Sequence, residues 1–402
     1  MPAALHPQPD SSTTGRHIPA LDGVRGIAVI LVLICHLFWS DGAPAGGHLL
    51  HFVAQFRAAG WVGVDLFFVL SGFLITGILY DTLPARHFFR NFYARRILRI
   101  FPLYYGVFAL LLLITSILGE HWSRSLFSYL TYTDNLHIKI HIPPTNAPWV
   151  NINHFWSLMV EEQFYLCWPL LVFLLRSRRR IAIAAILGAL ASLAVRLTLV
   201  HIGLSAHAPF LLYSWTPSCL DGLFLGALLA MAVRSRLRDR VLALSLPVLL
   251  ACAAVIAALW YTHSGFEPDH STVVATWGTF VLVIGFTAFT AATLRAGTLS
   301  QKAASDPTLR FFGRYSYGLY VYHYTIAGLI NGHLRPILLA HTGSKFLSVL
   351  IPGLIALALS VAVAWLSFTF YESRFLLLKK RFHDHSRRPK LHEFVAEPPA
   401  LH

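Results

Sequence analysis

Apolar runs of about 20 residues, the length that crosses the hydrocarbon core of a bilayer, divide most of this 402-residue chain. We count ten of them, at 20–40, 60–80, 101–118, 154–175, 181–200, 210–233, 241–261, 272–294, 311–332 and 346–371. This pattern predicts an all-α fold, a polytopic membrane bundle of about ten transmembrane helices. With 56% hydrophobic and 12% charged residues, the composition excludes a disordered chain, a coiled coil and a typical cytosolic enzyme.

The first run is expected to be a permanent helix and not a cleaved signal peptide. It follows Leu21-Asp22-Gly23, contains charged residues, and has no small-residue cleavage site after it. We therefore expect three parts: a cytoplasmic segment at 1–19, a transmembrane domain at 20–373, and a basic, disordered cytoplasmic tail at 374–402. The four cysteines lie in apolar runs without metal-ligand spacing, so we expect buried thiols and no disulfide framework.

Positive charge alternates along the chain between successive gaps, the segments that separate one apolar run from the next and that we number in chain order. Of the 32 Lys and Arg residues, 24 lie in the two end segments and the even-numbered gaps, five lie in the odd-numbered gaps, and three (Arg25, Arg196 and Arg314) lie within runs. Because cytoplasmic loops are enriched in Lys and Arg, both termini are predicted to be cytoplasmic. The net charge of +14 then reflects topology and attraction to anionic membrane lipid, and no nucleic-acid partner is expected.

Ionisable residues within a spanning helix are costly and mark a site, a relay or a structural ion pair. In the first run, Arg25 and His36 are eleven residues apart, which places them within about 20° of one helix face and about 16 Å apart along it. Asp22 can pair with Arg25 at i, i+3. A neutral histidine there is suited to general-base catalysis. Alternatively, Arg25 reaches lipid phosphates and His36 bonds a neighbouring helix.

The second run places Asp65 and Ser71 in the membrane. A carboxylate there must be paired or protonated, and Asp65 could orient His36 or pair with Arg25 or Arg314; the sequence does not choose. Ser71 precedes Gly72, and this pair favours close helix packing over a nucleophile.

The fourth run contains two adjacent carboxylates, Glu161 and Glu162, whose side chains project about 100° apart. We therefore expect at most one of them to line a cavity while the other pairs with a basic residue. Asp221, Arg314, His323 and Glu372 complete the intramembrane ionisable set, and each in isolation favours a structural role.

Five blocks, taken together and in order, resemble the acyltransferase 3 family of membrane O-acyltransferases. They are residues 21–26 with His36, 63–73, 95–102, 155–165 and 313–320. The resemblance implies transfer of an acyl group, most often acetyl, from an acyl-CoA co-substrate on the cytoplasmic side to a hydroxyl. The acceptor would be an envelope carbohydrate or a small molecule. No bound cofactor or metal is expected, and the location would be the cytoplasmic (inner) membrane. The form is the stand-alone one without an SGNH hydrolase-like domain.

The resemblance also implies roles for particular residues. The family's Arg-x10-His motif falls on Arg25 and His36, and its essential charged positions fall on Asp65 and on Glu161 or Glu162. His36 would be the general base or would carry the acyl group itself, and Arg25 would bind coenzyme A phosphate or polarise the carbonyl. Further candidates for substrate or coenzyme A binding are Asp22, Ser71, Arg95, Arg96, Arg99, Trp156, Asp221, Arg314, Tyr317 and His323. Topology alone also explains the arginines between 86 and 99.

The third gap, 119–153, contains aromatic and amide side chains suited to sugar recognition, although a plain surface loop fits equally well. They are Tyr129, Tyr132, Asn135, His141, Asn146 and Trp149. A membrane transporter without chemistry is the alternative function, because intramembrane His, Asp and Arg also form substrate pathways. The sequence shows neither an inverted repeat nor a matched pair of broken helices, which favours the enzyme. A structural or sensory protein would not explain the recurring blocks.

Overall fold

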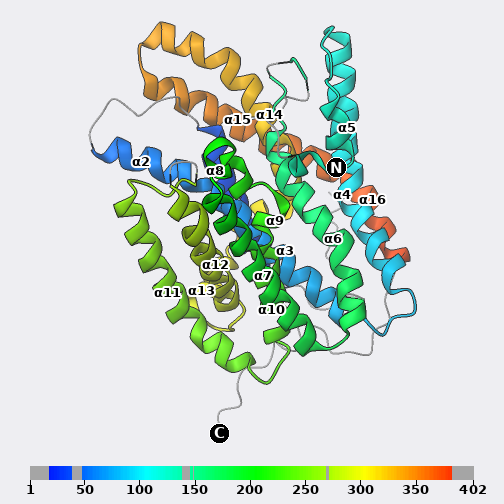
Figure 1. Cartoon of the computed structure of the whole chain (residues 1–402). Helices are drawn as coiled ribbons and strands as arrows, with labels where there is room; N and C mark the ends of the chain where they lie inside the picture. Colours follow the sequence, from blue (N-terminus) through cyan, green and yellow to red (C-terminus); the bar gives the residue numbers. More distant parts are fainter. Residues whose placement is uncertain (1–17, 39–47, 138–144, 148, 269–270, 383–402) are drawn as a thin grey trace.

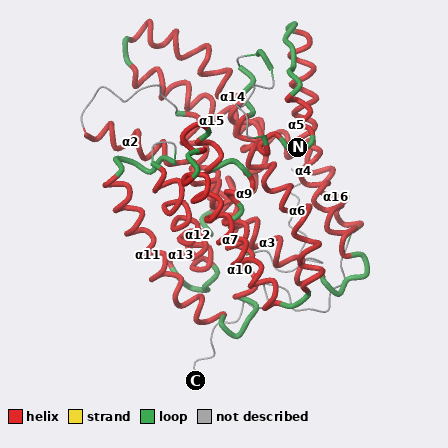
Figure 2. Tube along the Cα trace, viewed as in Figure 1, coloured by secondary structure: helices red, strands yellow, loops and turns green. Residues whose placement is uncertain are grey.

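The computed structural model describes residues 18–38, 48–137, 145–147, 149–268 and 271–382, and this part of the chain is almost entirely helical (Figures 1 and 2). The longer helices are α1 (Pro19–Leu37), α2 (His48–Ala58), α3 (Gly63–Thr82), α4 (Phe88–Ile117), α6 (Trp156–Leu175), α7 (Arg178–His201), α10 (Asp221–Ala232), α11 (Arg238–Thr262), α12 (Thr279–Thr293), α14 (Pro307–Thr342) and α15 (Lys345–Ser367). Short helices between them include α5 (Ser125–Leu130), α8 (Leu204–His207), α9 (Thr216–Cys219), α13 (Leu299–Ala304) and α16 (Ser373–Leu378).

Eight helical stretches in the described part are long and apolar enough to cross a membrane, which confirms the polytopic all-α class. Two of the predicted runs are not among these eight stretches. The sixth run is not one helix, because it is divided into short helical pieces at Pro209–Leu212 and Thr216–Cys219, each with a proline in its first turn. Only the 12-residue α10 is its regular part. The ninth run lies within the 36-residue α14, whose many polar residues keep it out of that apolar set.

Helix α1 lies at the centre of the bundle, packed against α3 and α14. The contact with α14 is a backbone contact, because a Cβ atom on Gly26 would lie 1.9 Å from the Leu309 carbonyl oxygen. A Cβ on Gly313 would lie 1.8 Å from the Asp22 carbonyl oxygen. These glycines set the distance between the two helices that carry His36 and His323.

A Gly26→Ala variant is therefore expected to be strongly destabilised, by on the order of 3 kcal/mol, because the added methyl group must push α1 from α14. The measurement is the melting temperature of the detergent-purified protein. Gly332→Ala is the matched control, because Gly332 is an exposed helical residue of α14 with no atom within 4 Å of its Cβ position. There the alanine should leave the melting temperature unchanged or slightly raised. Equal melting temperatures for both variants would contradict the glycine contact.

A second close contact joins α3 to α10. A Cβ on Gly226 would lie 2.0 Å from the Val69 carbonyl oxygen, and one on Gly222 would lie 3.5 Å from the Asp65 carbonyl oxygen. This packing brings the start of α10, and with it Asp221, next to the start of α3. Two intramembrane acidic residues that are far apart in sequence therefore become neighbours.

The arginine-rich connections lie together, as the charge pattern predicts. The turns that join α3 to α4, α6 to α7 and α10 to α11 all lie toward the bottom of Figure 1. Which side of a membrane this end faces stays a prediction. Of the cysteines, Cys35, Cys219 and Cys252 are buried as expected, whereas Cys167 is exposed on the outer surface of α6, and all four thiols are free.

The first residues of the segment expected as a disordered tail, 374–402, are helical. Helix α16 and a 3-10 turn at Lys379–Arg381 continue the chain beyond residue 374, while residues 383–402 lie outside the described part.

Candidate active site

A cavity of about 1470 Å³ opens among the helices on the side away from the arginine-rich turns. It exceeds the roughly 300–1,000 Å³ of typical small-molecule sites. Its wall combines intramembrane helices with the loops between α4 and α6. Among the lining residues are His36, Asp65, His154, Trp156, Arg196 and Tyr324. His36, Asp65 and Trp156, all predicted as site residues, thus line one cavity.

His36 is connected to α14 by a hydrogen bond between its Nδ1 atom and Nε2 of His323, at 2.8 Å. The Nδ1 atom of His323 lies 2.8 Å from the Tyr320 carbonyl oxygen and 3.1 Å from that of Leu319. Because carbonyl oxygens only accept, His323 Nδ1 carries a proton, and its Nε2 accepts from His36 when His323 is neutral. His36 then holds its own proton on Nδ1, which leaves the lone pair on its Nε2 atom.

A third histidine, His154, lies beside this pair. Its Nε2 atom donates to the same Tyr320 carbonyl oxygen at 2.8 Å, and its ring centroid lies 4.9 Å from that of His323. The Tyr320 hydroxyl donates to the His154 carbonyl oxygen and also contacts Ser157. Tyr324 stacks on His36 with ring centroids 4.4 Å apart. The rings therefore fix one another in position.

Arg25 does not line this cavity, although it lies on the same helix as His36. It pairs with Asp22 at 3.4 Å, and its nearest charged neighbours include Arg99 and Arg96 of α4. The Lys379 ammonium group interacts electrostatically with the same arginines and with Arg95. Arg25 and His36 thus mark two separate regions, a basic cluster (Arg25, Arg95, Arg96, Arg99 and Lys379) and the cavity.

Glu161 faces the basic cluster. It accepts a hydrogen bond from the Ser71 hydroxyl, and Ser71 in turn accepts one from Tyr165 at 3.0 Å. The Ser71 hydroxyl therefore has a polar role that the packing interpretation missed. The guanidinium group of Arg96 stacks over the Tyr165 ring at 5.6 Å.

Glu162 lies on a different face of α6 from Glu161, as the 100° offset between them requires. Its carboxylate interacts electrostatically with Tyr105, Tyr132 and Tyr317. Neither glutamate lines the large cavity, which agrees with the expectation that at most one of them would line a cavity. Both lie within the field of Arg96.

A second hollow of about 40 Å³ contains Arg99, Arg314 and Tyr317. The Tyr317 hydroxyl donates to the Ile100 carbonyl oxygen at 2.9 Å, and Arg314 lies over the Phe368 ring at 5.3 Å. Arg314 is exposed. These three predicted residues therefore lie together but apart from His36.

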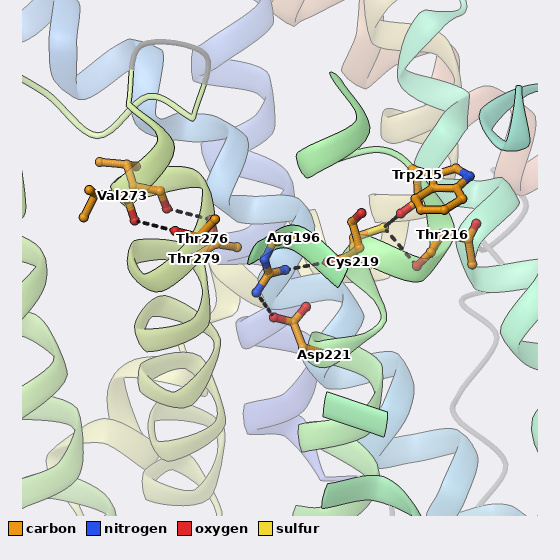
Figure 3. A network of polar contacts seen from close by, with 10 residues as sticks. Arg196, Trp215, Thr216, Cys219, Asp221, Val273, Thr276 and Thr279 are labelled. Atoms are coloured by element: carbon orange, nitrogen blue, oxygen red, sulfur yellow. Dashed lines mark hydrogen bonds and ion pairs between the residues drawn. The ribbon is translucent and has the colours of Figure 1, made fainter. Parts of the chain in front are cut away.

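Asp65 is buried, and the charged groups nearest to it are Asp221 and Arg196. None of the three partners that the sequence left open, His36, Arg25 and Arg314, acts on the Asp65 carboxylate as a charged group. Arg196 is fully buried and donates to Asp221 at 2.6 Å and to the Ser218 carbonyl oxygen at 2.5 Å (Figure 3). The ion pair explains how two charges are accommodated inside the bundle.

The third gap contributes to the cavity through Asn135, which donates to Ser214 and Thr216. Tyr129 and Tyr132 are buried; Tyr132 stacks on Tyr104, and burial raises its hydroxyl pKa, so the hydroxyl stays neutral. His141 lies outside the described residues. Asn146 and Trp149 are not in the cavity wall.

His154, Tyr320 and Arg196 line the cavity although the sequence did not predict them as site residues. Arg196 carried a signal, because it is a charge within an apolar run. Tyr320 belongs to one of the blocks that carry the family resemblance and His154 directly precedes another, but nothing in the pattern indicated that they meet. Within the described ranges, no three His, Cys, Asp or Glu side chains are placed to hold a metal ion.

Comparisons with known proteins agree with the blocks of the sequence. A family model described as an acyltransferase domain, that of acyltransferase 3, matches residues 18–372. The O-acetyltransferase OatA of Staphylococcus aureus is 27% identical over 335 residues, covering 79% of this chain and 52% of the relative. The peptidoglycan O-acetyltransferase OatA of Listeria monocytogenes is 27% identical over 334 residues, covering 78% and 50%. The chain thus spans about half the length of these curated relatives. No solved structure gives a significant match.

Proposed function

The chain belongs to the acyltransferase 3 family, and from this we propose that it is a membrane O-acetyltransferase that uses acetyl-CoA as donor and a cell-envelope carbohydrate as acceptor. The named relatives support both the acetyl group and, through the Listeria protein, a peptidoglycan-type glycan. The cytoplasmic membrane is the proposed location, because the described helices form a multi-pass bundle.

The observation that carries the proposal is the position of His36. Its ring lines the cavity while its Nδ1 atom is engaged by His323, which is itself fixed by a backbone carbonyl. This chain of hydrogen bonds leaves Nε2 of His36 as the atom that accepts a proton. His323 is thus a positioning residue, because it selects the tautomer and orientation of the base.

In the proposed reaction, an acceptor hydroxyl lies against His36 in the cavity. Its oxygen attacks the thioester carbonyl, a C–O bond forms and the C–S bond breaks. The hydroxyl proton passes to Nε2 of His36 and from there to the departing coenzyme A thiolate. A thioester is already activated, so the enzyme's main tasks are proton removal and alignment.

The donor is proposed to approach from the basic cluster. Arg25, Arg96 and Arg99 come from two helices and converge near Lys379, which provides positive charge for the phosphates of coenzyme A. The pantetheine arm would then extend along α1 toward His36, about 16 Å from Arg25 along the helix. The two residues of the Arg-x10-His motif would hold opposite ends of the same donor.

The test is a transfer assay with purified full-length protein, acetyl-labelled CoA and soluble peptidoglycan fragments from a muramidase digest. We expect label on the fragments as an ester that mild alkali releases, together with free coenzyme A. A transporter would leave the thioester intact. If labelled CoA is not consumed with these fragments, the proposed acetyl transfer to peptidoglycan is wrong.

A further inference from the structure

Two charged side chains in the cavity wall, Asp65 of α3 and Arg196 of α7, lie outside the network of histidines. Asp65 is 6% exposed and Arg196 is 0% exposed. They come from helices that α10 holds together through its close contact with α3 and its packing against α7. Figure 3 shows the Arg196 guanidinium group lying between helices, directed toward Asp221.

The hydrogen bonds around these two residues are incomplete. Two nitrogens of Arg196 bond to Asp221 and to the Ser218 carbonyl oxygen, but its Nε atom has no partner among the described residues. The Oδ2 atom of Asp65 and the Oδ1 atom of Asp221 are also buried without one. Native proteins pair nearly all buried polar groups, so such a cluster requires an explanation.

The pattern of free groups selects among ligand classes. Two carboxylates face one guanidinium group, so the field disfavours an anion. An apolar acyl chain would leave the carboxylate oxygens and the Nε–H unsatisfied. A hydroxyl group satisfies both kinds of atom, because it donates to a carboxylate oxygen and accepts from an N–H group.

The rest of the wall fits a sugar ring that carries several hydroxyls. Trp156 and Tyr213 line the cavity with their ring centroids 6.2 Å apart, and the amides of Asn135 and Asn151 line it as well. Aromatic faces and convergent polar groups are the usual components of a site for a polar organic ligand.

We propose that Asp65 and Arg196 form a hydroxyl-binding subsite for the carbohydrate acceptor, on the same cavity as His36 but separate from the reacting atoms. The inference rests on the proposed function and adds to it the residues that recognise the acceptor. Asp221 holds Arg196 in place, and Asp65 accepts a hydrogen bond from a sugar hydroxyl that does not itself become acetylated.

The test compares wild-type protein with Asp65→Asn in the labelled-acetyl assay with peptidoglycan fragments. Replacing the carboxylate with an amide should raise the KM for the fragments at least tenfold. It should leave the KM for acetyl-CoA unchanged and kcat within about threefold, because His36 is intact. Ser218→Ala is the control: its side-chain oxygen is a buried, unpartnered group of the same region, but Ser218 is outside the cavity wall. It should leave all three constants unchanged.

Two further measurements keep the result decisive. Asp65→Ser, a smaller side chain, is used beside Asp65→Asn, and the melting temperature of each shows that it is folded. Isothermal titration of the fragments into each protein reports binding without turnover. If the wild-type protein labels the fragments but the folded Asp65 variants show no rise in the KM for them, the subsite is wrong and the proposed function stands. If the wild-type protein does not label the fragments, the proposed function is wrong, and the titration then tests the subsite by itself. Tenfold weaker binding of the fragments by the variants supports the subsite, and binding equal to wild type overturns it.

Discussion

A His36→Ala variant is expected to transfer acetyl groups with a kcat on the order of 10³-fold below wild type, because general-base catalysis by a positioned side chain contributes about 10²–10⁴-fold. In the proposed reaction the Nε2 atom of this imidazole takes the acceptor's proton, and alanine removes the ring together with its bond to His323. The fold should tolerate the change, since His36 is only half-buried and lies at the cavity. The measurement is the steady-state rate of fragment labelling.

His333→Ala provides the matched control for this experiment. His333 lies on α14, as His323 does, but it is exposed and outside the cavity wall. Within the described residues its ring bonds the Leu329 carbonyl oxygen of its own helix, so the variant should label fragments at the wild-type rate. A His36→Ala protein that is folded and keeps the wild-type kcat would remove His36 from the chemistry.

The sequence was sufficient to predict the helices that are regular and apolar. The period and length of each run are local properties, so eight spans could be read directly. The sixth run could not, because apolarity does not distinguish a spanning helix from short pieces separated by Pro209 and Pro217. The ninth was misjudged in length, since the polar residues of α14 continue its helix to Thr342.

The candidate site was predictable only within single helices. The spacing of Arg25 and His36 places them on one face of α1, and this needs no tertiary information. The partner of His36 lies 287 residues away, on a helix that Gly26 and Gly313 allow to approach closely. No local pattern pairs two such positions, which is why His323 was expected as a binding residue and not as the neighbour of His36.

Asp65 illustrates the same limit. The partners named for it from the sequence were His36, Arg25 and Arg314, whereas the charged groups near it are Arg196 and Asp221. The packing of α10 on α3 decides this through Gly222 and Gly226. The positions of small residues, more than those of charges, therefore determine which intramembrane charges meet.

Asp221→Ala should strongly destabilise the bundle, by about 3–5 kcal/mol, because it leaves the buried Arg196 guanidinium without the carboxylate to which it is hydrogen-bonded. Arg196 is 0% exposed and cannot turn to water, and its remaining bond goes to the Ser218 carbonyl oxygen. We expect a large fall in melting temperature in detergent, or loss of monodisperse protein on size exclusion.

Asp239→Ala is the control that separates burial from charge pairing as such. Asp239 faces Arg238 at 3.9 Å with its side chain 91% exposed, and exposed pairs contribute only about 0–1 kcal/mol. Its melting temperature should therefore match wild type. If the Asp221→Ala protein also has the melting temperature of the wild type, the Arg196–Asp221 pair does not hold the helices together. The position of Arg196 in the cavity wall must then depend on its contact with the Ser218 backbone.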